Sequence, residues 1–220
     1  IKNKKKIDIL FNKHKPHLII NLAAETHVDN SIIEPDAFIN SNIIGTFNLL
    51  LASKRYLDNN LFFKNKFKFI HISTDEVYGS LSNKKNKSFT ENSKFLPNSP
   101  YAASKASSDL LVRAWNKTYN LPTIITNCAN NFGPWQYPEK LIPLSVKLLM
   151  RDPKIRLHDQ GQPIRNWLHS ADTARAVTTI IESGRVNEIY NVAGGFEQKN
   201  YDTVSKIIKS YFVSQNFFIG

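Results

Sequence analysis

The chain has 220 residues, of which 41% are hydrophobic and 21% charged, enough apolar sequence for one globular domain or one and part of another. Its formal net charge of +11 is not accompanied by a zinc-finger spacing or a recognised nucleic-acid module, so we expect no nucleic-acid partner. We assign the charge mainly to lysine-rich solvated faces, while a phosphorylated substrate remains an alternative explanation.

The cysteine content and the hydropathy pattern bear on the compartment. Cys128 is the only cysteine, so no internal disulfide can form, and a reducing environment fits. No apolar stretch approaches transmembrane length, and the amino end lacks the apolar region of a signal peptide. The sequence therefore predicts a soluble, cytoplasmic protein with no membrane partner.

Predicted strands alternate with predicted helices along the chain. Helices are expected near residues 3–14, 35–56, 100–119, 138–150, 170–183 and 201–212. Strands are expected at 17–24, from 67 to about 72, and at 121–128, 154–158 and 188–193, with loops at 80–99 and 129–137. The first helix should bury Ile7, Leu10 and Phe11 on one face. This order is typical of an α/β fold with a doubly wound parallel sheet.

The stretch FKFIHISTDEVYG, residues 67–79, combines a strand pattern with a polar end. Its apolar residues give way to Ser73, Thr74, Asp75 and Glu76, which would lie at the carboxyl end of a buried parallel strand. That edge is where ligands bind in open α/β sheets. Two adjacent carboxylates suit chemistry that needs both an acid and a base. Taken alone, they would more simply cap a loop or a helix.

A second motif follows in SPYAASKASSD, where Tyr101 and Lys105 are four residues apart and share a face of the predicted helix. A neighbouring ammonium favours the phenolate form of a tyrosine, which could then take a proton from a sugar hydroxyl. The alternative is an ordinary amphipathic helix with both side chains half exposed. The Thr–Asp–Glu run one loop upstream favours the catalytic interpretation.

One expected motif is not found. A dinucleotide-binding fold should begin with a strand, a glycine-rich turn and a helix whose amino end holds the pyrophosphate. This chain opens inside a predicted helix and closes just after an apolar one, at FFIG. We therefore expect it to be truncated at both ends.

Together these motifs resemble the extended short-chain dehydrogenase/reductase superfamily and, within it, the dTDP-glucose 4,6-dehydratases. The resemblance covers nearly all of the chain and rests on LAAETHVDNS (22–31), NIIGTFNLL (42–50), HISTDEVYG (71–79), SPYAASKASSDLLVRAW (99–115), LPTIITNCANNFGPWQYPEKLIPL (121–144), GQPIRNWLHSAD (161–172), EIYNVAGG (188–195) and QKN (198–200). It implies an incomplete NAD-binding Rossmann-like domain at 1–132 and a mixed, truncated region with substrate-binding loops at 133–220.

The resemblance also implies a reaction. Tyr101 would be the base at the C4 hydroxyl of the sugar, and Lys105 would lower the pKa of Tyr101 and hold the nicotinamide ribose. Thr74 would hydrogen-bond the C4 oxygen. After C4 is oxidised, Glu76 would remove the C5 proton and Asp75 would protonate the departing C6 hydroxyl. Hydride would then return to C6, giving a 4-keto-6-deoxy sugar nucleotide.

Further positions take binding roles from the resemblance. Cofactor contacts, besides Tyr101 and Lys105, would come from Leu22, Ala23, Ala24, Ser41 and Asn131. Substrate contacts, besides Thr74, would come from Asn130, Lys140, Leu141, Arg156, His158, Arg165 and Asn200. No metal is implied, because His27 has no second ligand at a convincing spacing. A homodimer is implied, formed by helices that include 100–119 and expose Leu110, Leu111 and Trp115.

Alternatives stay open at this point. The chain could act as a UDP-sugar dehydratase, epimerase or decarboxylase of the same superfamily, or be an inactive fragment that binds a sugar nucleotide. The Thr–Asp–Glu run favours a dehydratase over an epimerase. His158 stands at a nucleotide-contacting position where another residue type is expected, which leaves the choice between thymine and uracil undecided.

Overall fold

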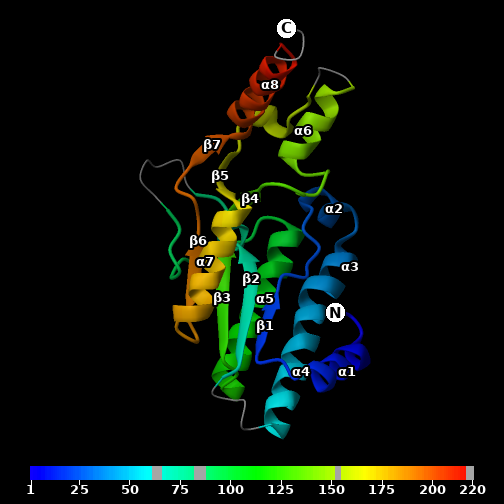
Figure 1. The fold of residues 1–220 in the computed structure, drawn as a ribbon, viewed down its shortest axis with the longest axis vertical. Helices are drawn as coiled ribbons and strands as arrows, with labels where there is room; N and C mark the ends of the chain where they lie inside the picture. Colours follow the sequence, from blue (N-terminus) through cyan, green and yellow to red (C-terminus); the bar gives the residue numbers. More distant parts are fainter. Residues whose placement is uncertain (61–65, 82–87, 152–154, 217–220) are drawn as a thin grey trace. The chain divides into compact units, whose positions relative to one another are not determined.

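The structure is a computed structural model that describes residues 1–60, 66–81, 88–151 and 155–216 (Figure 1). Its helices are α1 Lys4–His14, α2 Val28–Ile33, α3 Pro35–Phe38, α4 Gly45–Asn59, α5 Pro100–Tyr119, α6 Leu141–Leu149, α7 Ser170–Ser183 and α8 Asn200–Asn216. A π-helical segment η1, Ile39–Ile44, and the 3₁₀ helices η3, Asp75–Tyr78, and η4, His158–Gly161, complete them. The strands are β1 Leu18–Asn21, β2 Lys68–Thr74, β3 Thr123–Cys128, β4 Asn130–Phe132, β5 Ile164–His169, β6 Ile189–Val192 and β7 Glu197–Lys199.

The described residues form two compact units. The first comprises Ile1–Cys128 and Arg175–Val192, and the second Ala129–Ala174 and Ala193–Gly220. The chain therefore leaves the first unit after β3 and returns to it before β6. The division at residue 132 into NAD-binding and substrate-binding regions concerns function and stays a prediction.

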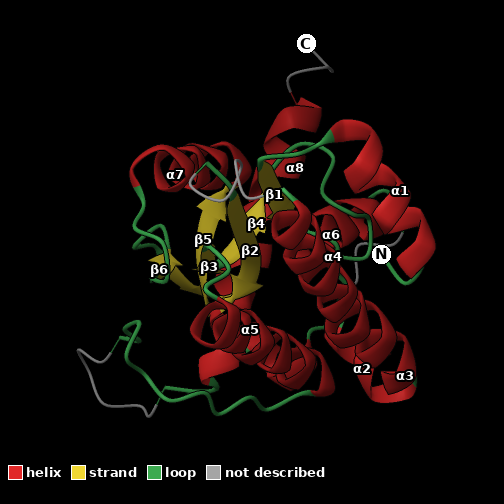
Figure 2. Ribbon diagram, turned by 90° about the horizontal axis from the view of Figure 1, so that it is seen from below, coloured by secondary structure: helices red, strands yellow, loops and turns green. Residues whose placement is uncertain are grey.

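The first unit is built on a parallel sheet with strand order β1-β2-β3-β6. Because all four strands run in one direction, their carboxyl ends lie at the same edge. Helices cover both faces (Figure 2). Side chains of α5 meet one face of β2, where Ser73 bonds Asp109, while Lys68 on the other face bonds the carbonyl of Ile181 in α7. The predicted doubly wound parallel α/β fold is confirmed.

The core of this unit lies between the sheet and the helices α1, α4 and α5. Leu50, Phe69 and Val112 are fully buried, and Ile7 and Phe11 of α1 are nearly so. Burying a side chain of this size contributes about 1.5–3 kcal/mol. The packed core fixes α5 against β2, which carry the motifs singled out from the sequence.

The second unit contains a smaller sheet with order β4-β5-β7, in which β4 is parallel and β7 antiparallel to β5. Helices α6 and α8 pack against each other in the same unit. Sequence patterns did not predict these three strands. Two of them have only three residues, and most of their side chains are at least partly exposed, so the apolar alternation of a strand is weak.

Some of the other predicted helices and strands agree with the structure and others do not. Helix α5 has the bounds that were predicted, whereas the helix expected from residue 35 is interrupted by the π-helical segment η1. The strand expected at 154–158 is wrong: residues 155–157 have no regular structure and η4 begins at His158, while residue 154 lies outside the described residues.

Three surface predictions also need correction. Leu10 is 53% exposed, although α1 buries its neighbours Ile7 and Phe11. On α5 only Leu110 is exposed as expected, at 56%. Leu111 and Trp115 pack against the core, because they lie on the flank of the helix that faces α4 and the sheet.

Candidate active site

The carboxyl end of β2 carries the polar run. Thr74 is the N-cap of η3, and its hydroxyl accepts a hydrogen bond from the backbone N–H of Glu76 at 3.3 Å. Asp75 and Glu76 form the first turn of η3 and are half-buried. The cap is therefore Thr74, whose hydroxyl also donates to Asp75 Oδ1 at 3.4 Å, and both carboxylates stand at the carboxyl edge of the sheet.

A buried anchor fixes the other end of η3. The Tyr78 hydroxyl accepts a hydrogen bond from Asn127 Nδ2 at 2.7 Å and donates one to Asn191 Oδ1 at 2.9 Å. Its ring contacts Phe89 and Phe95, with centroid separations of 5.1 and 5.6 Å. Because Tyr78 is only 1% exposed, the two carboxylates are held on a turn with little freedom to move.

The amino-terminal half of α5 contributes Tyr101 and Lys105. Ser99 caps the helix by accepting a hydrogen bond from the Ala102 N–H at 3.1 Å, and Pro100 occupies its first turn. Tyr101 is 8% and Lys105 is 4% exposed, so the half-exposed amphipathic alternative is wrong. The Tyr101 phenol is hydrogen-bonded to the Thr74 side chain, and Lys105 Nζ donates to the Ile72 carbonyl at 2.8 Å.

The charges around Tyr101 keep its phenol protonated. Burial raises the pKa of Tyr101 most strongly, and the negative charges of Glu76, Asp75 and Asp109 raise it further. Only the hydrogen bond with Thr74 acts in the opposite direction. The Lys105 ammonium is directed to the Ile72 carbonyl, and the lowering of the Tyr101 pKa by Lys105 stays a prediction.

A buried polar cluster on the same face was not identified from the sequence. Asp109 Oδ2 accepts a hydrogen bond from Ser73 Oγ at 2.9 Å, and Asp109 Oδ1 lies 3.3 Å from His71 Nε2. His71 Nδ1 lies 3.2 Å from Asn21 Nδ2. The available signal was a histidine inside an apolar strand and an aspartate one helical repeat after Lys105.

The residues assigned to the cofactor lie mainly after β1. Leu22 is 66% exposed, Ala23 is exposed, and Ala24 and Ser41 are partly buried. Asn42, which the sequence analysis did not single out, holds this loop: its side chain bonds the backbone N–H and carbonyl of Glu25 at 2.8 and 3.0 Å. The same side chain donates to Ser104 on α5 at 2.8 Å.

In the second unit, Asn131 is already engaged. Its amide donates to the Ala129 carbonyl at 3.0 Å, and its Oδ1 accepts a hydrogen bond from Thr173. Asn130 begins β4 and is partly buried. The side chain of Asn131 therefore shapes the turn after β3, and its backbone carbonyl accepts a hydrogen bond from Gln136 Nε2 at 2.9 Å.

The remaining substrate candidates are spread over the second unit. Lys140 precedes α6 and Leu141 begins it, while Arg156 and His158 are exposed. Arg165 on β5 and Asn200 at the start of α8 lie near each other, since Arg165 pairs with Gln198 in the β5–β7 ladder and the Asn200 N–H bonds the Pro163 carbonyl. This part of the ladder combines a guanidinium with an amide, groups that suit a diphosphate.

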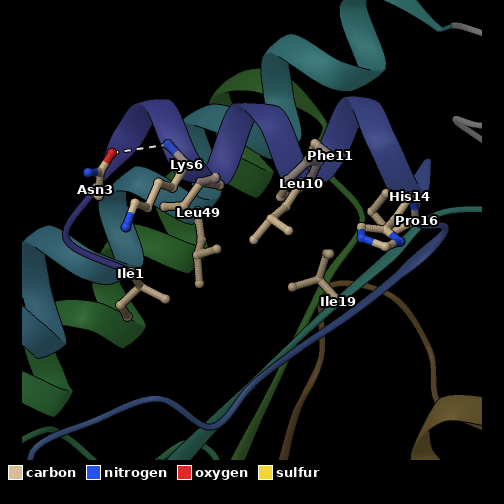
Figure 3. A pocket seen from close by; sticks show the side chains of 10 residues that line it. Ile1, Asn3, Lys6, Leu10, Phe11, His14, Pro16, Ile19 and Leu49 are labelled. Atoms are coloured by element: carbon tan, nitrogen blue, oxygen red, sulfur yellow. Dashed lines mark hydrogen bonds between the residues drawn. The ribbon is translucent and has the colours of Figure 1, made fainter.

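A surface pocket of about 490 Å³ lies elsewhere in the first unit (Figure 3). It is lined mainly by apolar side chains of α1 and its neighbours: Ile1, Asn3, Lys6, Ile7, Leu10, Phe11, His14, Pro16, Ile19 and Leu49. None of the candidate residues lines it, and its lining contains no carboxylate. The pocket therefore lacks the acid and base groups of the Thr74–Glu76 edge.

Membrane spans and metal clusters are the other features to consider. Across the described ranges, no helix is both long and apolar enough to span a bilayer. In the same ranges, His, Cys, Asp and Glu side chains do not gather in groups of three or more that could hold a metal ion.

The family model described as "GDP-mannose 4,6 dehydratase" matches residues 1–216. The dTDP-glucose 4,6-dehydratase 1 of Escherichia coli strain K12 is 48% identical over 208 residues, which cover 90% of this chain and 57% of that relative. A dTDP-glucose 4,6-dehydratase of Xanthomonas campestris is 45% identical over 201 residues, 90% of this chain and 56% of its own length. The chain thus spans little more than half the length of these relatives.

Solved structures of dTDP-glucose 4,6-dehydratases and of an epimerase are also similar to this chain. The dTDP-glucose 4,6-dehydratase of Bacillus anthracis in complex with NAD has a TM-score of 0.80 at 41% identity, covering 94% of this chain and 61% of that one. A double mutant of DesIV from Streptomyces venezuelae, a dTDP-glucose 4,6-dehydratase with NAD and DAU bound, has a TM-score of 0.87 at 37% identity, with coverages of 96% and 61%. A Thermotoga maritima UDP-glucose 4-epimerase with UDP-glucose is 25% identical, with a TM-score of 0.83 and coverages of 94% and 65%.

Proposed function

The chain belongs to the GDP-mannose 4,6 dehydratase family, and from this premise we propose that the protein containing it converts dTDP-glucose to dTDP-4-keto-6-deoxyglucose with NAD as cofactor. The observation that carries the proposal is the arrangement at the end of β2. Thr74 is bonded to Tyr101, and the charges of Asp75 and Glu76 both act on the same phenol. A dehydratase needs these three kinds of group near one sugar: a base for a hydroxyl, a base for a carbon acid and an acid for the leaving group.

The first unit offers groups that fit the nicotinamide half of NAD. Leu22 and Ala23 expose apolar side chains at the carboxyl end of β1, where a planar ring could lie. The Lys105 ammonium has three N–H donors, one of which goes to the Ile72 carbonyl, so it can also hold ribose hydroxyls. When bound, NAD supplies the acceptor and donor of hydride.

The proposed chemistry assigns a proton to each group. Tyr101 takes the proton of the C4 hydroxyl, and Thr74 hydrogen-bonds the C4 oxygen. Once C4 is a ketone, the C5 proton is acidic, and Glu76 removes it while Asp75 protonates the departing C6 hydroxyl. Two adjacent carboxylates must therefore differ in protonation, and their titrations are expected to be coupled.

Tyr101 can act as a base only if a nearby positive charge offsets the effects of burial and of the carboxylates on its pKa. Burial and three carboxylates raise its pKa in the ligand-free chain, so at neutral pH it is a phenol. Lys105 lies one turn further along the same buried face of α5 and is the cation proposed for this task. A change in the hydrogen bonding of Lys105, away from Ile72, is thus part of the proposal.

Residues of the second unit are proposed to hold the nucleotide part of the substrate. Arg165 and Asn200 would bind the diphosphate, Arg165 through its guanidinium and Asn200 through the N–H donors of its side-chain amide. Lys140 adds positive charge at the start of α6, and Arg156 and His158 are exposed for contact with the nucleoside. Asn130 is assigned to the sugar.

The test is a labelled-product assay in D₂O. The purified chain, and the complete protein in which it occurs, are incubated with dTDP-glucose and NAD⁺, and the product is examined by mass spectrometry and NMR. We expect loss of one water and deuterium at C5. Glu76→Gln should reduce both by about 10²–10⁴-fold, whereas Asp75→Asn should slow water loss more than exchange at C5.

The matched control is Glu182→Gln, which removes the same charge from an exposed position on α7. It should leave the product and its deuterium unchanged. If Glu76→Gln binds both ligands and still gives labelled product at the rate of the control, the role of Glu76 is wrong. An epimerised sugar that keeps its C6 oxygen would instead favour the UDP-sugar epimerase alternative, and competition between dTDP and UDP decides the nucleobase.

Assembly and compartment are part of the same proposal. A homodimer through α5 is supported by Leu110, which is 56% exposed on that helix. A cytoplasmic location is supported by Cys128, the only cysteine, which is buried and unpaired. Sedimentation of the purified protein tests the assembly, and a monomer at all concentrations would contradict it.

A further inference from the structure

The proposed reaction assigns no role to Asp109, a buried carboxylate. Asp109 lies on α5 in the same face as Tyr101 and Lys105, at successive intervals of four residues. It is 1% exposed, as is His71 on β2. Burying an ionisable group in this way is costly unless it is paired, so both side chains need an explanation.

The contacts of Asp109 define its orientation. Ser73 Oγ donates to Oδ2 at 2.9 Å, and His71 Nε2 lies 3.3 Å from Oδ1. Both partners belong to β2, on either side of Ile72, whose carbonyl receives the Lys105 ammonium at 2.8 Å. Three consecutive residues of β2 thus contact both groups: His71 and Ser73 contact the Asp109 carboxylate, and Ile72 contacts the Lys105 ammonium.

The protonation of His71 decides which cation balances Asp109. Asn21 Nδ2 can only donate, so His71 Nδ1, 3.2 Å away, is the acceptor and the proton sits on Nε2, which lies 3.3 Å from Asp109 Oδ1. Burial and the charge of Lys105 lower the pKa of His71 more than Asp109 raises it. His71 is therefore neutral, and Lys105 is the cation on which the charge of Asp109 acts.

We propose that Asp109 is a positioning residue whose carboxylate, oriented by Ser73 and the neutral His71, is the counter-ion that keeps Lys105 charged. Lys105 needs this help because burial lowers the pKa of its ammonium, and the charge of Asp109 is the largest opposing influence. The charge pairing concerns the ligand-free chain, whereas its catalytic consequence rests on the proposed function.

The pairing has a pH signature. Removing the negative charge should lower the pKa of Lys105, and it should also lower the pKa of Tyr101, which Asp109 raises. Both changes have the same sign, so the whole pH range of activity should move to lower pH. The other titratable groups that act on these two or on Asp109 are His71, Asp75, Glu76, Tyr78 and Cys128.

The first experiment titrates Lys105 in the ligand-free chain by ¹⁵N NMR of the lysine ammonium groups. Asp109→Asn should lower the pKa of Lys105 by about one unit or more. The matched control is Asp58→Asn, because Asp58 forms an i,i+4 pair with Lys54 at 2.5 Å on the surface of α4. If Lys105 titrates alike in Asp109→Asn, Asp58→Asn and the unmutated chain, the proposal is overturned.

A second measurement needs no variant and decides the matter if Asp109→Asn does not fold. The ¹⁵N shifts of His71 in the unmutated chain report its tautomer. We expect a neutral ring protonated on Nε2 at about pH 7. An imidazolium at that pH would make His71 the partner of Asp109 and would overturn the role given to Lys105.

The catalytic arm separates this inference from the proposed function. If the unmutated protein forms product, Asp109→Asn should move both limbs of the pH profile of kcat to lower pH, while Asp58→Asn should leave them in place. A loss of kcat with an unmoved profile would show a structural role only. If no variant forms product, the proposed function fails, and the two NMR measurements still decide the pairing.

Discussion

Tyr101 shows how strongly one side chain depends on the residues around it. Its hydroxyl is bonded to Thr74, yet burial and the charges of Glu76, Asp75 and Asp109 disfavour the phenolate. A phenol in this state is a hydrogen-bond donor and a poor base. Tyr101 is therefore a neutral phenol, and it can lose its proton only after the charges around it change.

The raised pKa of Tyr101 predicts a loss of stability in alkali. A group whose folded pKa lies above its unfolded value stabilises the chain below the unfolded pKa, near 10 for tyrosine, and this contribution is lost as the pH rises toward the folded pKa. The slope for one such proton is about 1.4 kcal/mol per pH unit. Urea unfolding of Tyr101→Phe and the unmutated chain should therefore differ progressively above about pH 10.

The phenyl ring of the Tyr101→Phe variant cannot ionise, so this variant should lose less stability than the unmutated chain over that range. Tyr119→Phe is the matched control, because Tyr119 on the same helix is 44% exposed. Its unfolding free energy should follow that of the unmutated chain. A constant difference between Tyr101→Phe and the unmutated chain at every pH would show that burial does not shift the pKa of Tyr101.

Helix α5 organises the site at the scale of an element. It places Tyr101, Lys105 and Asp109 on one buried face, and its two ends are fixed by local rules. Ser99 caps the amino end, and Asn120 ends the helix in the left-handed region at φ 54°. Because Tyr101 lies in the first turn, the position of its hydroxyl depends on the cap.

Loss of the cap should affect stability first. Ser99→Ala removes the acceptor of the Ala102 N–H and should reduce the unfolding free energy by about 1 kcal/mol, measured by urea denaturation. Ser99→Asp keeps an acceptor at the cap and should restore most of the loss. If both variants unfold like the unmutated chain, the amino end of α5 is held by tertiary contacts and not by Ser99.

Sequence patterns predicted those elements whose residues obey a local rule. The bounds of α5 follow from a proline after a serine cap, and β2 follows from its apolar run. The π-helical segment η1 could not be predicted, because Asn42 within it bonds Glu25 and Ser104, which are distant in sequence. The same holds for the contact of His71 with Asp109, whose nearest atoms are 3.3 Å apart.

The site was predicted unevenly for a related reason. Thr74, Tyr101 and Lys105 were found because their spacing is characteristic, and the structure brings Thr74 and Tyr101 into contact. Their roles, and those of the residues in the second unit, stay predictions. What spacing could not give was the sign of the electrostatics at Tyr101, since that depends on burial and on charges that only the folded chain brings together.

At the scale of the whole molecule, the two units are interleaved in sequence. β6 lies between the two segments of the second unit in the chain but belongs to the sheet of the first, where it pairs with β3. Asn191 on β6 accepts the hydrogen bond of the Tyr78 hydroxyl, and its own N–H donates to Glu91 at 2.9 Å. The anchor of η3 therefore depends on residues far from it in sequence.

This arrangement predicts that a fragment ending at residue 132 is unstable. Such a fragment lacks β6, which exposes one edge of β3 and leaves the buried Tyr78 hydroxyl without Asn191, a loss of about 1–3 kcal/mol for the hydroxyl alone. Fragment 1–132 should unfold at lower urea concentration and less cooperatively than fragment 1–192, which keeps β6. Equal midpoints and slopes would show that 132 is a true domain boundary. A large difference would show that the first unit cannot be separated there, because its sheet is completed only when the chain returns to it with β6.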